Sequence, residues 1–379
     1  MVAFGLNTVC GQTFENMDVK EFASLTADST VVVLDVRKAD EYTQGHIRGA
    51  VLIDQFNSDF VEQVKNKVPK DKTIAVYCRS GRRSANAATL LANEGYKTVN
   101  LKGGIMAWMN EGQPFTYFLP TDDASTEEDA RAAMEVYLPK KEMANGCAVI
   151  LCPGGAMRWL SWESDVVRMA SFLNERGIAA MGLRYHLNKS PMRQGVKMPP
   201  MVDVTHPDHF PQADANPMHD TTGDSILQLA KSDAMAAIRI VREHADQWNV
   251  GKDKIGFLGF SAGGGVAIAA TISATDDMER PNFLSTNFGP SLMPVSVPVD
   301  APPLLIMTRA DHPNVAAGLV ALFMEWKKSG ANAEMHIYGD GKGPYELMPQ
   351  TGETTTESWS SQLIQWLSAK GFLGSVSHQ

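Results

Sequence analysis

The chain has 379 residues, enough for about two domains of ordinary size. Hydrophobic residues make up 44% and charged residues 20%, which excludes a mainly disordered chain. Acidic residues outnumber basic ones by 43 to 34, giving a net charge of −9, so the chain lacks the basic character that non-specific nucleic-acid binding needs. The sequence contains no run of about 18 apolar residues, the pattern that would indicate a membrane span. Four cysteines are too few for a disulfide framework.

The N-terminal segment leaves two interpretations open. Residues 1–11 are apolar at first and end in small residues, like the second half of a signal peptide with its cleavage site, although no basic segment precedes them. On that interpretation residues 1–12 are the remnant of a leader and the protein is periplasmic. On the other, the segment is a frayed N-terminus and the protein is cytoplasmic.

Residues 13–115 have the pattern of one α/β domain. The short β-branched runs at 31–34 and 73–77 predict buried parallel strands. An Ala- and Leu-rich segment at 84–93, closed by a glycine, predicts a helix. Residues 116–130 are expected to be a linker, because most of this segment, from Pro120 onward, is polar and acidic.

Residues 131–374 alternate between strand-like and helical patterns. Strands are predicted at 147–152, 178–183, 254–259, 304–308 and 333–338, and helices at 163–175, 233–244, 262–272, 315–328 and 358–370. The alternation predicts a second α/β domain, with a doubly wound sheet and sites at the carboxyl ends of its strands. Residues 187–222 break the pattern and are expected to form a lid or binding loop. Residues 375–379 are expected to be a tail.

A cysteine followed by arginines lies directly after the strand predicted at 73–77. The segment reads Cys78-Arg79-Ser80-Gly81-Arg82-Arg83 and leads into the next predicted helix. Backbone N–H groups at a helix start and nearby guanidinium groups stabilise a thiolate, the reactive form of cysteine. The same donors suit an anionic substrate or a persulfide. We therefore predict that Cys78 is a catalytic nucleophile rather than an inert buried thiol.

The residues around this segment resemble a single-domain rhodanese over residues 13–112. The matching segments are Asp35-Val36-Arg37, Glu41-Tyr42, Gly45-His46-Ile47, Gly49-Ala50, Cys78 to Arg83, Leu101-Lys102-Gly103-Gly104 and Trp108. The resemblance implies an α/β sulfurtransferase that moves sulfane sulfur from a small anionic donor to a thiol or cyanide acceptor. It implies no cofactor.

The resemblance also implies roles for single residues. Cys78 would carry the sulfur as a persulfide. The residues implied to bind the substrate or to brace its loop are Arg79, Ser80, Gly81, Arg82, Arg83, Asp35 and Arg37.

A second candidate nucleophile is Ser261, in Gly259-Phe260-Ser261-Ala262-Gly263. The segment lies between a predicted strand and a helix of small residues, the context of the G-x-S-x-G elbow that lifts a serine hydroxyl above a sheet. A Pro-Gly-Gly-Ala turn follows the strand predicted at 147–152. We expect the N–H groups of Gly155, Ala156 and Ala262 to form an oxyanion hole.

The second domain resembles an α/β-hydrolase of the acetyl-xylan esterase and carboxylesterase type over residues 130–374. Besides the elbow, the matching segments are Leu183-Arg184-Tyr185, Asp233-Ala234, Pro302-Pro303-Leu304-Leu305 and Ala310-Asp311. The resemblance implies hydrolysis of an acyl ester or an acetylated sugar, with Ser261 as nucleophile and Asp311 as the acid of a Ser–Asp–His triad. The histidine is not matched, because the loop that should hold it reads Gly339-Asp340-Gly341-Lys342-Gly343-Pro344-Tyr345-Glu346.

Three explanations of the missing histidine are open. A serine hydroxyl without a base is a poor nucleophile at neutral pH, so turnover requires a replacement. The first explanation is another histidine, either His312 beside Asp311 or one from the loop at 187–222. The second is Lys342, acting as a neutral base after desolvation lowers its pKa. The third is a non-catalytic domain that binds a ligand. Among the histidines we expect His312 to be the recruit.

The remaining candidates are weaker signals. The spacing of the loop histidines, His206, His209 and His219, does not predict a metal site, and no metal is expected. Trp159 and Trp162 follow the Gly-Gly turn and either line a sugar or acyl pocket or are buried aromatic residues at a helix start. The sequence thus predicts sulfur transfer at Cys78 as the leading function, with ester hydrolysis at Ser261 or ligand binding by the second domain as the alternatives.

Overall fold

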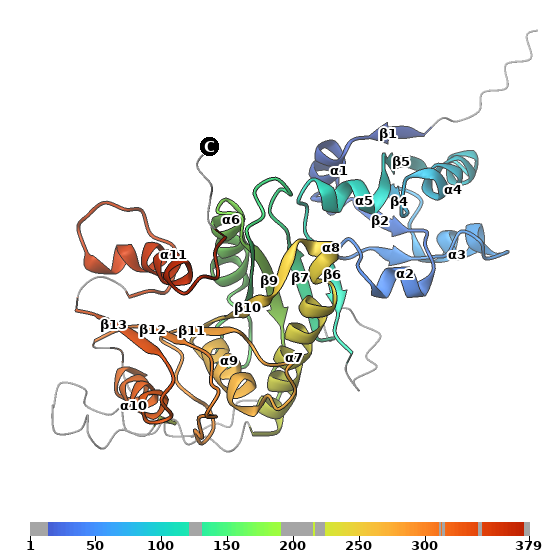
Figure 1. Cartoon of the computed structure of the whole chain (residues 1–379). Coiled ribbons are helices and arrows are strands. Elements are labelled where there is room, and N and C mark those ends of the chain that lie inside the picture. The colour runs from blue at the N-terminus through green and yellow to red at the C-terminus, as the bar shows by residue number, and fades with distance from the viewer. Residues whose placement is uncertain are drawn as a thin grey trace, which may run out of the picture. The chain divides into compact units, whose positions relative to one another are not determined.

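The computed structural model describes residues 14–120, 131–190, 215–216, 224–310, 312, 315–339 and 343–374 (Figure 1). These residues form two compact units that divide between Tyr117 and Phe118. Several predicted features lie outside the described residues: the N-terminal segment 1–13, the tail 375–379, Asp311, Lys342, and the loop histidines His206, His209 and His219.

The first unit is a five-stranded parallel sheet with helices in the connections. Its strands are β1 (Glu15–Met17), β2 (Val31–Asp35), β3 (Val51–Leu52), β4 (Thr73–Tyr77) and β5 (Lys97–Leu101), in the order β1-β5-β4-β2-β3. Its helices are α1 (Val19–Thr26), α2 (Ala39–Thr43), α3 (Phe60–Lys67), α4 (Arg82–Asn93) and α5 (Gly104–Asn110). The two strands and the helix predicted here are present as β2, β4 and α4.

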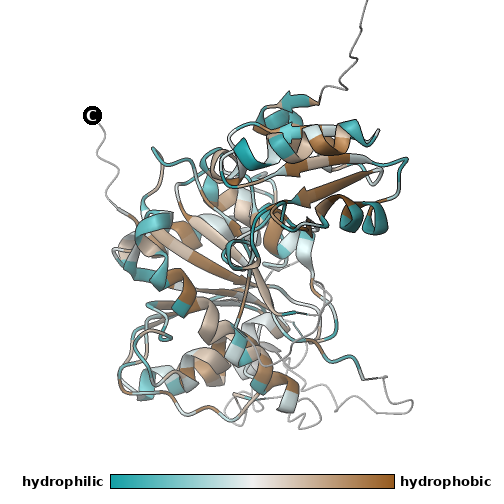
Figure 2. Cartoon of the chain, turned by 90° about the vertical axis from the view of Figure 1, so that its right-hand side faces the viewer, coloured by the Kyte–Doolittle hydropathy of each residue, from teal (hydrophilic) through white to brown (hydrophobic). Residues whose placement is uncertain are grey.

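The central strand β4 is buried on both faces. Successive side chains of a strand point to opposite faces of the sheet. Ile74 and Val76 accordingly pack in one core cluster, with α4, while Ala75 and Tyr77 pack in the other, with α1. Figure 2 shows hydrophobic residues, in brown, along strands of the sheet to which β4 belongs. A strand covered on both sides is held rigidly, and the residue that follows its carboxyl end is Cys78.

The second sheet has eight strands and helices on both faces, and its first strand, β6, includes the division between the units. Its strands are β6 (Phe115–Phe118), β7 (Ala133–Tyr137), β8 (Gly146–Cys152), β9 (Ala179–Arg184), β10 (Val250–Phe260), β11 (Phe283–Asn287), β12 (Leu304–Arg309) and β13 (Ala333–Tyr338). Its α-helices are α6 (Met169–Asn174), α7 (Asp224–Glu243), α8 (Ala245–Trp248), α9 (Ala262–Ser273), α10 (Val315–Lys328) and α11 (Trp359–Ala369). In Figure 1, α6 and α11 lie on one side of the sheet and α7, α9 and α10 on the other.

The strand order of this sheet is that of the α/β-hydrolase fold. The order is β6-β7-β9-β8-β10-β11-β12-β13, so the third and fourth strands along the chain exchange places in the sheet. β7 is antiparallel to β9, whereas the neighbouring pairs from β9 to β13 are parallel. The predicted fold class, two α/β domains of which the second is doubly wound, is confirmed.

Two stretches differ in detail from the sequence expectation. Part of the segment expected to be a linker is the strand β6, at the edge of the second sheet. The helix predicted at 163–175 begins as a π-helical turn, Glu163–Arg168, before continuing as α6. Such π-helical turns are frequent at functional sites, and this one carries Asp165, which lines a cavity described below.

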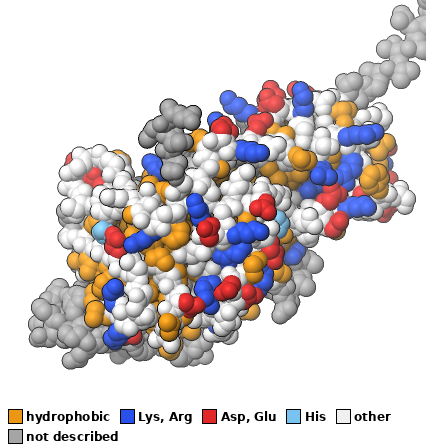
Figure 3. All heavy atoms as spheres, in the orientation of Figure 1, with side chains coloured by type: hydrophobic (Ala, Val, Ile, Leu, Met, Phe, Trp, Pro, Cys, Tyr) orange, Lys and Arg blue, Asp and Glu red, His pale blue; other side chains and the backbone are white. Residues whose placement is uncertain are grey.

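The surface of the described residues is of mixed charge. Figure 3 shows acidic and basic side chains interspersed on one face, with hydrophobic ones between them. Among the described helices, none combines the length and the apolar character needed to cross a membrane.

Candidate active sites

Cys78 lies at the junction between β4 and α4. Gly81 precedes α4 with a left-handed φ of 87°, a conformation that glycine adopts at no steric cost. Its amide N–H donates to Cys78 Sγ over 3.2 Å, and the Ser84 hydroxyl donates to the same sulfur over 3.4 Å. Only 1% of Cys78 is exposed. The sulfur is thus buried and accepts hydrogen bonds from two groups of its own loop and the following helix.

These donors decide the acidity of the thiol. Burial by itself would raise the pKa of Cys78, because it disfavours the charged form. Hydrogen bonds from the Ser84 hydroxyl and from the amides of Ser84, Ser80 and Gly81 outweigh burial, so the pKa of Cys78 lies below its ordinary value. The site therefore favours the thiolate, the nucleophilic form.

The arginines of the loop stabilise the Cys78 thiolate less directly than their closeness in sequence suggests. Arg83 forms an ion pair with Glu41, in which Nη1 and Nη2 donate to the two carboxylate oxygens over 2.7 and 2.5 Å. Its pKa is raised, first by Glu41 and to a smaller degree by Cys78. Arg79 and Arg82 are exposed. The strongest stabilisation of the thiolate therefore comes from amide and hydroxyl groups.

The neighbouring loops hold the Cys78 loop in place. Arg37 donates to Asp35 over 2.6 Å and to the Gly45 carbonyl over 2.7 Å, which ties together two segments near the end of β2. The N–H of Ile105 donates to the Cys78 carbonyl over 2.9 Å. Gly104 lets this segment approach closely, since a Cβ there would lie 2.4 Å from that carbonyl oxygen.

Ser261 occupies a strained turn between β10 and α9. Its backbone has φ 50° and ψ −122°, a conformation that non-glycine residues adopt rarely and at a cost. Its N–H donates to the Asn287 carbonyl over 3.0 Å, and its own carbonyl accepts from Gly264 over 2.9 Å. The next helix approaches closely because a Cβ on Gly263 would lie 2.1 Å from the Cys152 carbonyl oxygen. This is the geometry expected of a nucleophile elbow.

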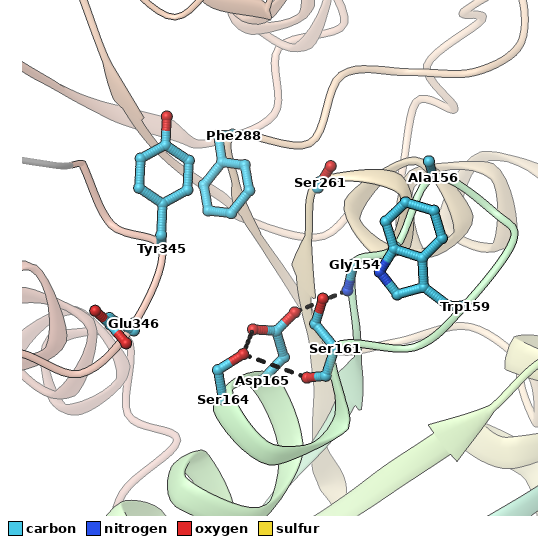
Figure 4. Close-up of a pocket in the computed structure, with 11 residues that line it drawn as sticks. Gly154, Ala156, Trp159, Ser161, Ser164, Asp165, Ser261, Phe288, Tyr345 and Glu346 are labelled. Carbon is cyan, nitrogen blue, oxygen red and sulfur yellow. Dashed lines mark hydrogen bonds between the residues drawn. The ribbon is translucent and has the colours of Figure 1, made fainter.

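A cavity of about 390 Å³ opens beside Ser261 (Figure 4). The described residues that line it are Gly154, Gly155, Ala156, Trp159, Ser161, Ser164, Asp165, Ser261, Phe288, Tyr345 and Glu346. Trp159, one of the two tryptophans considered above, is among them. Asp165, Tyr345 and Glu346 were not identified as site residues from the sequence, because no motif marks them and Asp165 lies about 180 residues before the other two.

The Gly-Gly turn is held from two sides. The Gly154 N–H donates to Asp165 Oδ2 over 2.8 Å, which engages this amide and leaves those of Gly155 and Ala156 as the expected oxyanion donors. Burial raises the pKa of Asp165, against the opposing effect of hydrogen bonds from Gly154 and Ser164. On the other side, Tyr185 Oη donates to the Pro153 carbonyl over 2.7 Å.

The structure does not bring a described histidine to Ser261. Ser261 Oγ makes no hydrogen bond to any described residue, and the described lining of the cavity includes no histidine. The His312 ring stacks on Phe288 with centroids 5.8 Å apart and lies 5.9 Å from the ring of Tyr345. His312 thus packs against two residues of the cavity wall.

Two other cysteines are ordinary core residues. Cys147 and Cys152 are buried in β8. Burial raises the pKa of Cys147 to about 12 and raises that of Cys152 further still. Neither forms a thiolate near neutral pH, which sets both apart from Cys78.

Comparisons with known proteins agree with the first site. The rhodanese-like domain family matches residues 18–111. YtwF of Bacillus subtilis is 38% identical over 104 residues, which cover 26% of this chain and 98% of that protein. A sulfurtransferase of Allochromatium vinosum is 35% identical over 100 residues, covering 26% of this chain and 91% of its own. A chloroplastic thiosulfate sulfurtransferase of Arabidopsis thaliana is 37% identical over 21% of this chain and 76% of its own.

The second unit has matches of a different kind. The BD-FAE family matches residues 212–305. An acetyl ester-xyloside bifunctional hydrolase from Caldicellulosiruptor lactoaceticus aligns with a TM-score of 0.48 and 20% identity, covering 67% of this chain and 93% of that structure. A likeness at this level says nothing about activity. The fold of the second unit rests on its strand order.

Proposed function

Because this chain belongs to the rhodanese-like family through its first unit, we propose that it is a sulfurtransferase that carries sulfane sulfur as a persulfide on Cys78. The observation that carries this proposal is the set of N–H and O–H donors from Ser80, Gly81 and Ser84 around the sulfur. A persulfide is an anion like the thiolate, so the same donors favour it.

The reaction would proceed in two displacements. First, the Cys78 thiolate attacks the outer sulfur of an anionic donor such as thiosulfate. A sulfur–sulfur bond forms at Sγ, the donor's sulfur–sulfur bond breaks, and its electron pair leaves with sulfite. An acceptor thiolate or cyanide then attacks the outer sulfur of the persulfide, and the electron pair of the breaking bond returns to Sγ. Charge and sulfur balance without a further oxidant or a cofactor.

The test is sulfur transfer from thiosulfate to cyanide, followed as thiocyanate. We expect Cys78→Ala to abolish it. Cys147→Ala is the matched control, because the pKa of about 12 keeps that thiol protonated. Mass spectrometry of the wild type with thiosulfate alone should show one added sulfur on the Cys78 peptide. Transfer that survives in Cys78→Ala, or an unmodified Cys78 peptide, overturns the proposal.

The strained conformation of Ser261 favours a second function for the other unit. We infer that Ser261 attacks an acyl ester or an acetylated sugar, with the N–H groups of Gly155, Ala156 and Ala262 as the oxyanion hole. Strain of this kind persists only where the surrounding structure enforces it, and it clusters at active sites. Asp311 would serve as the acid and His312 as the base, since His312 lies against the cavity wall.

Hydrolysis of p-nitrophenyl acetate tests this second function. The parent protein is Cys78→Ala, since a reactive thiolate also attacks activated esters. We expect Ser261→Ala and His312→Ala to reduce the rate by orders of magnitude. His336→Ala is the control, because His336 lies within β13 and pairs with Glu334.

Each other outcome selects an alternative. A rate that depends on Ser261 but not on His312 excludes His312 as the base and directs the search to Lys342. A rate equal in the parent and in Ser261→Ala contradicts hydrolysis at this serine. In that case a ligand that raises the melting temperature without turnover would identify a binding module.

A further inference from the structure

The three arginines of the Cys78 loop have different environments. Arg83 is only 22% exposed in its side chain, and its charge is matched by that of Glu41. Arg79 and Arg82 are exposed, and neither forms an ion pair with a described residue. The loop that covers the sulfur therefore presents two uncompensated positive charges to solvent.

Two other cationic side chains of the first unit have acidic partners. Arg37 pairs with Asp35, and Lys65 pairs with both Glu62 and Glu94. Glu41, the carboxylate that bonds to this loop, is occupied by Arg83. In a chain whose net charge is −9, two guanidinium groups that pair with no described carboxylate and lie within four residues of the nucleophile are a local excess of positive charge.

Any acceptor must pass this loop to reach the sulfur. Cys78 is 1% exposed, and the bonds from Gly81 and Ser84 surround Sγ with backbone and a buried side chain. The acceptor attacks as a thiolate and approaches a persulfide that is itself anionic. Positive charges beside this path reduce the repulsion, and a second negative group on the acceptor gains a favourable interaction with them.

We propose that Arg79 and Arg82 make this site selective for an anionic acceptor thiol, one that bears a carboxylate or similar group within a few bonds of its sulfur. The proposal rests on the sulfur transfer at Cys78 proposed above and specifies the acceptor of that reaction. Because both guanidinium groups are exposed, each contributes only about two- to fivefold to the rate, and salt screens the effect.

A single-turnover experiment with the whole chain isolates the acceptor step. Cys78 is first loaded with sulfur from thiosulfate, excess donor is removed, and the added sulfur is confirmed by mass. The loaded protein is then mixed with mercaptoacetate, mercaptoethanol or cysteamine at equal thiolate concentrations. These thiols are similar in size and differ in charge. We expect mercaptoacetate to react fastest and cysteamine slowest.

Variants of Arg79 and Arg82 test whether the loop causes the preference for the anionic thiol. Arg79→Gln and Arg82→Gln should each reduce the ratio of the mercaptoacetate rate to the cysteamine rate by about two- to fivefold. Arg79→Lys and Arg82→Lys should retain it, which separates charge from loop structure. Lys97→Gln is the matched control, because Lys97 pairs with Thr73 at the far end of β4, roughly 16 Å from Cys78 along the sheet.

The outcomes distinguish the proposal about the acceptor from the proposal that the protein is a sulfurtransferase. If no sulfur is loaded on Cys78, the sulfurtransferase proposal itself fails. If sulfur is loaded but the three thiols react at equal rates, the acceptor proposal fails. It fails equally if the ratio of the mercaptoacetate rate to the cysteamine rate is the same in both Gln variants as in the wild type, or does not fall in salt near 1 M, where the Debye length is about 3 Å.

Discussion

At the scale of single residues, the reactivity of Cys78 depends on a few donors that its own loop supplies. The sulfur is buried, which opposes ionisation, yet hydrogen bonds that include those from Gly81 and Ser84 lower the pKa of Cys78 below its ordinary value. A thiol with a low pKa reacts at a lower pH than a free cysteine, whose pKa is about 8.5. The pH dependence of alkylation therefore reports directly on these donors.

Replacing Ser84 tests their contribution. Ser84→Ala removes the hydroxyl that donates to Sγ, so we expect the pKa of Cys78 to rise by about one unit, the effect of one weak hydrogen bond to a charged group. The rate of alkylation by iodoacetamide should then fall near neutral pH and reach its plateau at a higher pH. Ser80→Ala is the control, because Ser80 contributes its backbone amide to the thiolate. Equal midpoints in the two variants would contradict this account.

Asp165 shows what a residue-level motif search misses. Its carboxyl group is buried, binds the Gly154 amide, and faces the cavity beside Ser261 (Figure 4). Nothing in the local sequence distinguishes it from Glu163, the acidic residue two positions earlier. Only the π-helical turn and the packing against the Gly-Gly turn give it this position.

At the scale of elements, both candidate nucleophiles lie where a buried strand turns directly into a helix. β4 precedes Cys78 and β10 precedes Ser261, and amides around the start of α4 donate to the Cys78 sulfur. Strands buried on both faces hold these turns in position. Close contacts that only glycine permits hold them from the other side.

Gly104 provides a test at this scale. Gly104→Ala would place a Cβ 2.4 Å from the Cys78 carbonyl oxygen, so the loop must shift. A displacement near 1 Å at a reactive group costs about a hundredfold in rate, and we expect a loss of that order in thiocyanate formation.

Gly49→Ala is the matched control for Gly104→Ala. Gly49 also has a positive φ, of 73°, but a Cβ there meets nothing within 4 Å. Like Gly104→Ala, Gly49→Ala should lose about 1–2 kcal/mol of stability because alanine disfavours a positive φ, and this loss should appear as a lower urea midpoint. Its rate of thiocyanate formation should be unchanged. Equal activity in the two variants would show that the close approach at Gly104 does not position the loop.

At the scale of the whole molecule, two units with separate sheets carry separate candidate sites. Each nucleophile is supported by the strands and helices of its own unit. We therefore expect Ser261→Ala and Asp165→Asn to leave both the rate of thiocyanate formation and the KM for thiosulfate unchanged. A change in either parameter would show that the second unit takes part in sulfur transfer.

Much of the fold was predictable because its strands and helices have strong local patterns. β2, β4, β8, β10 and β12 are apolar runs, and α4 and α9 have clear helical patterns, so the α/β class followed from the sequence. The strands β1, β3, β5, β6, β7 and β11 were not predicted. β11 reads Phe-Leu-Ser-Thr-Asn and is buried along its length by neighbouring elements rather than marked by its own composition.

The sequence by itself determined the two turns that present Cys78 and Ser261, because a strand-to-helix turn and its donors lie within a few consecutive residues. Tertiary structure alone decided which groups surround them. It engaged Arg83 with Glu41, more than forty residues away, whereas Arg79 and Arg82 have no ion pair with any described residue. It also brought Asp165, Phe288 and Tyr345 to one cavity from three distant segments. Such contacts depend on how strands are ordered in a sheet, which local patterns of polarity do not encode.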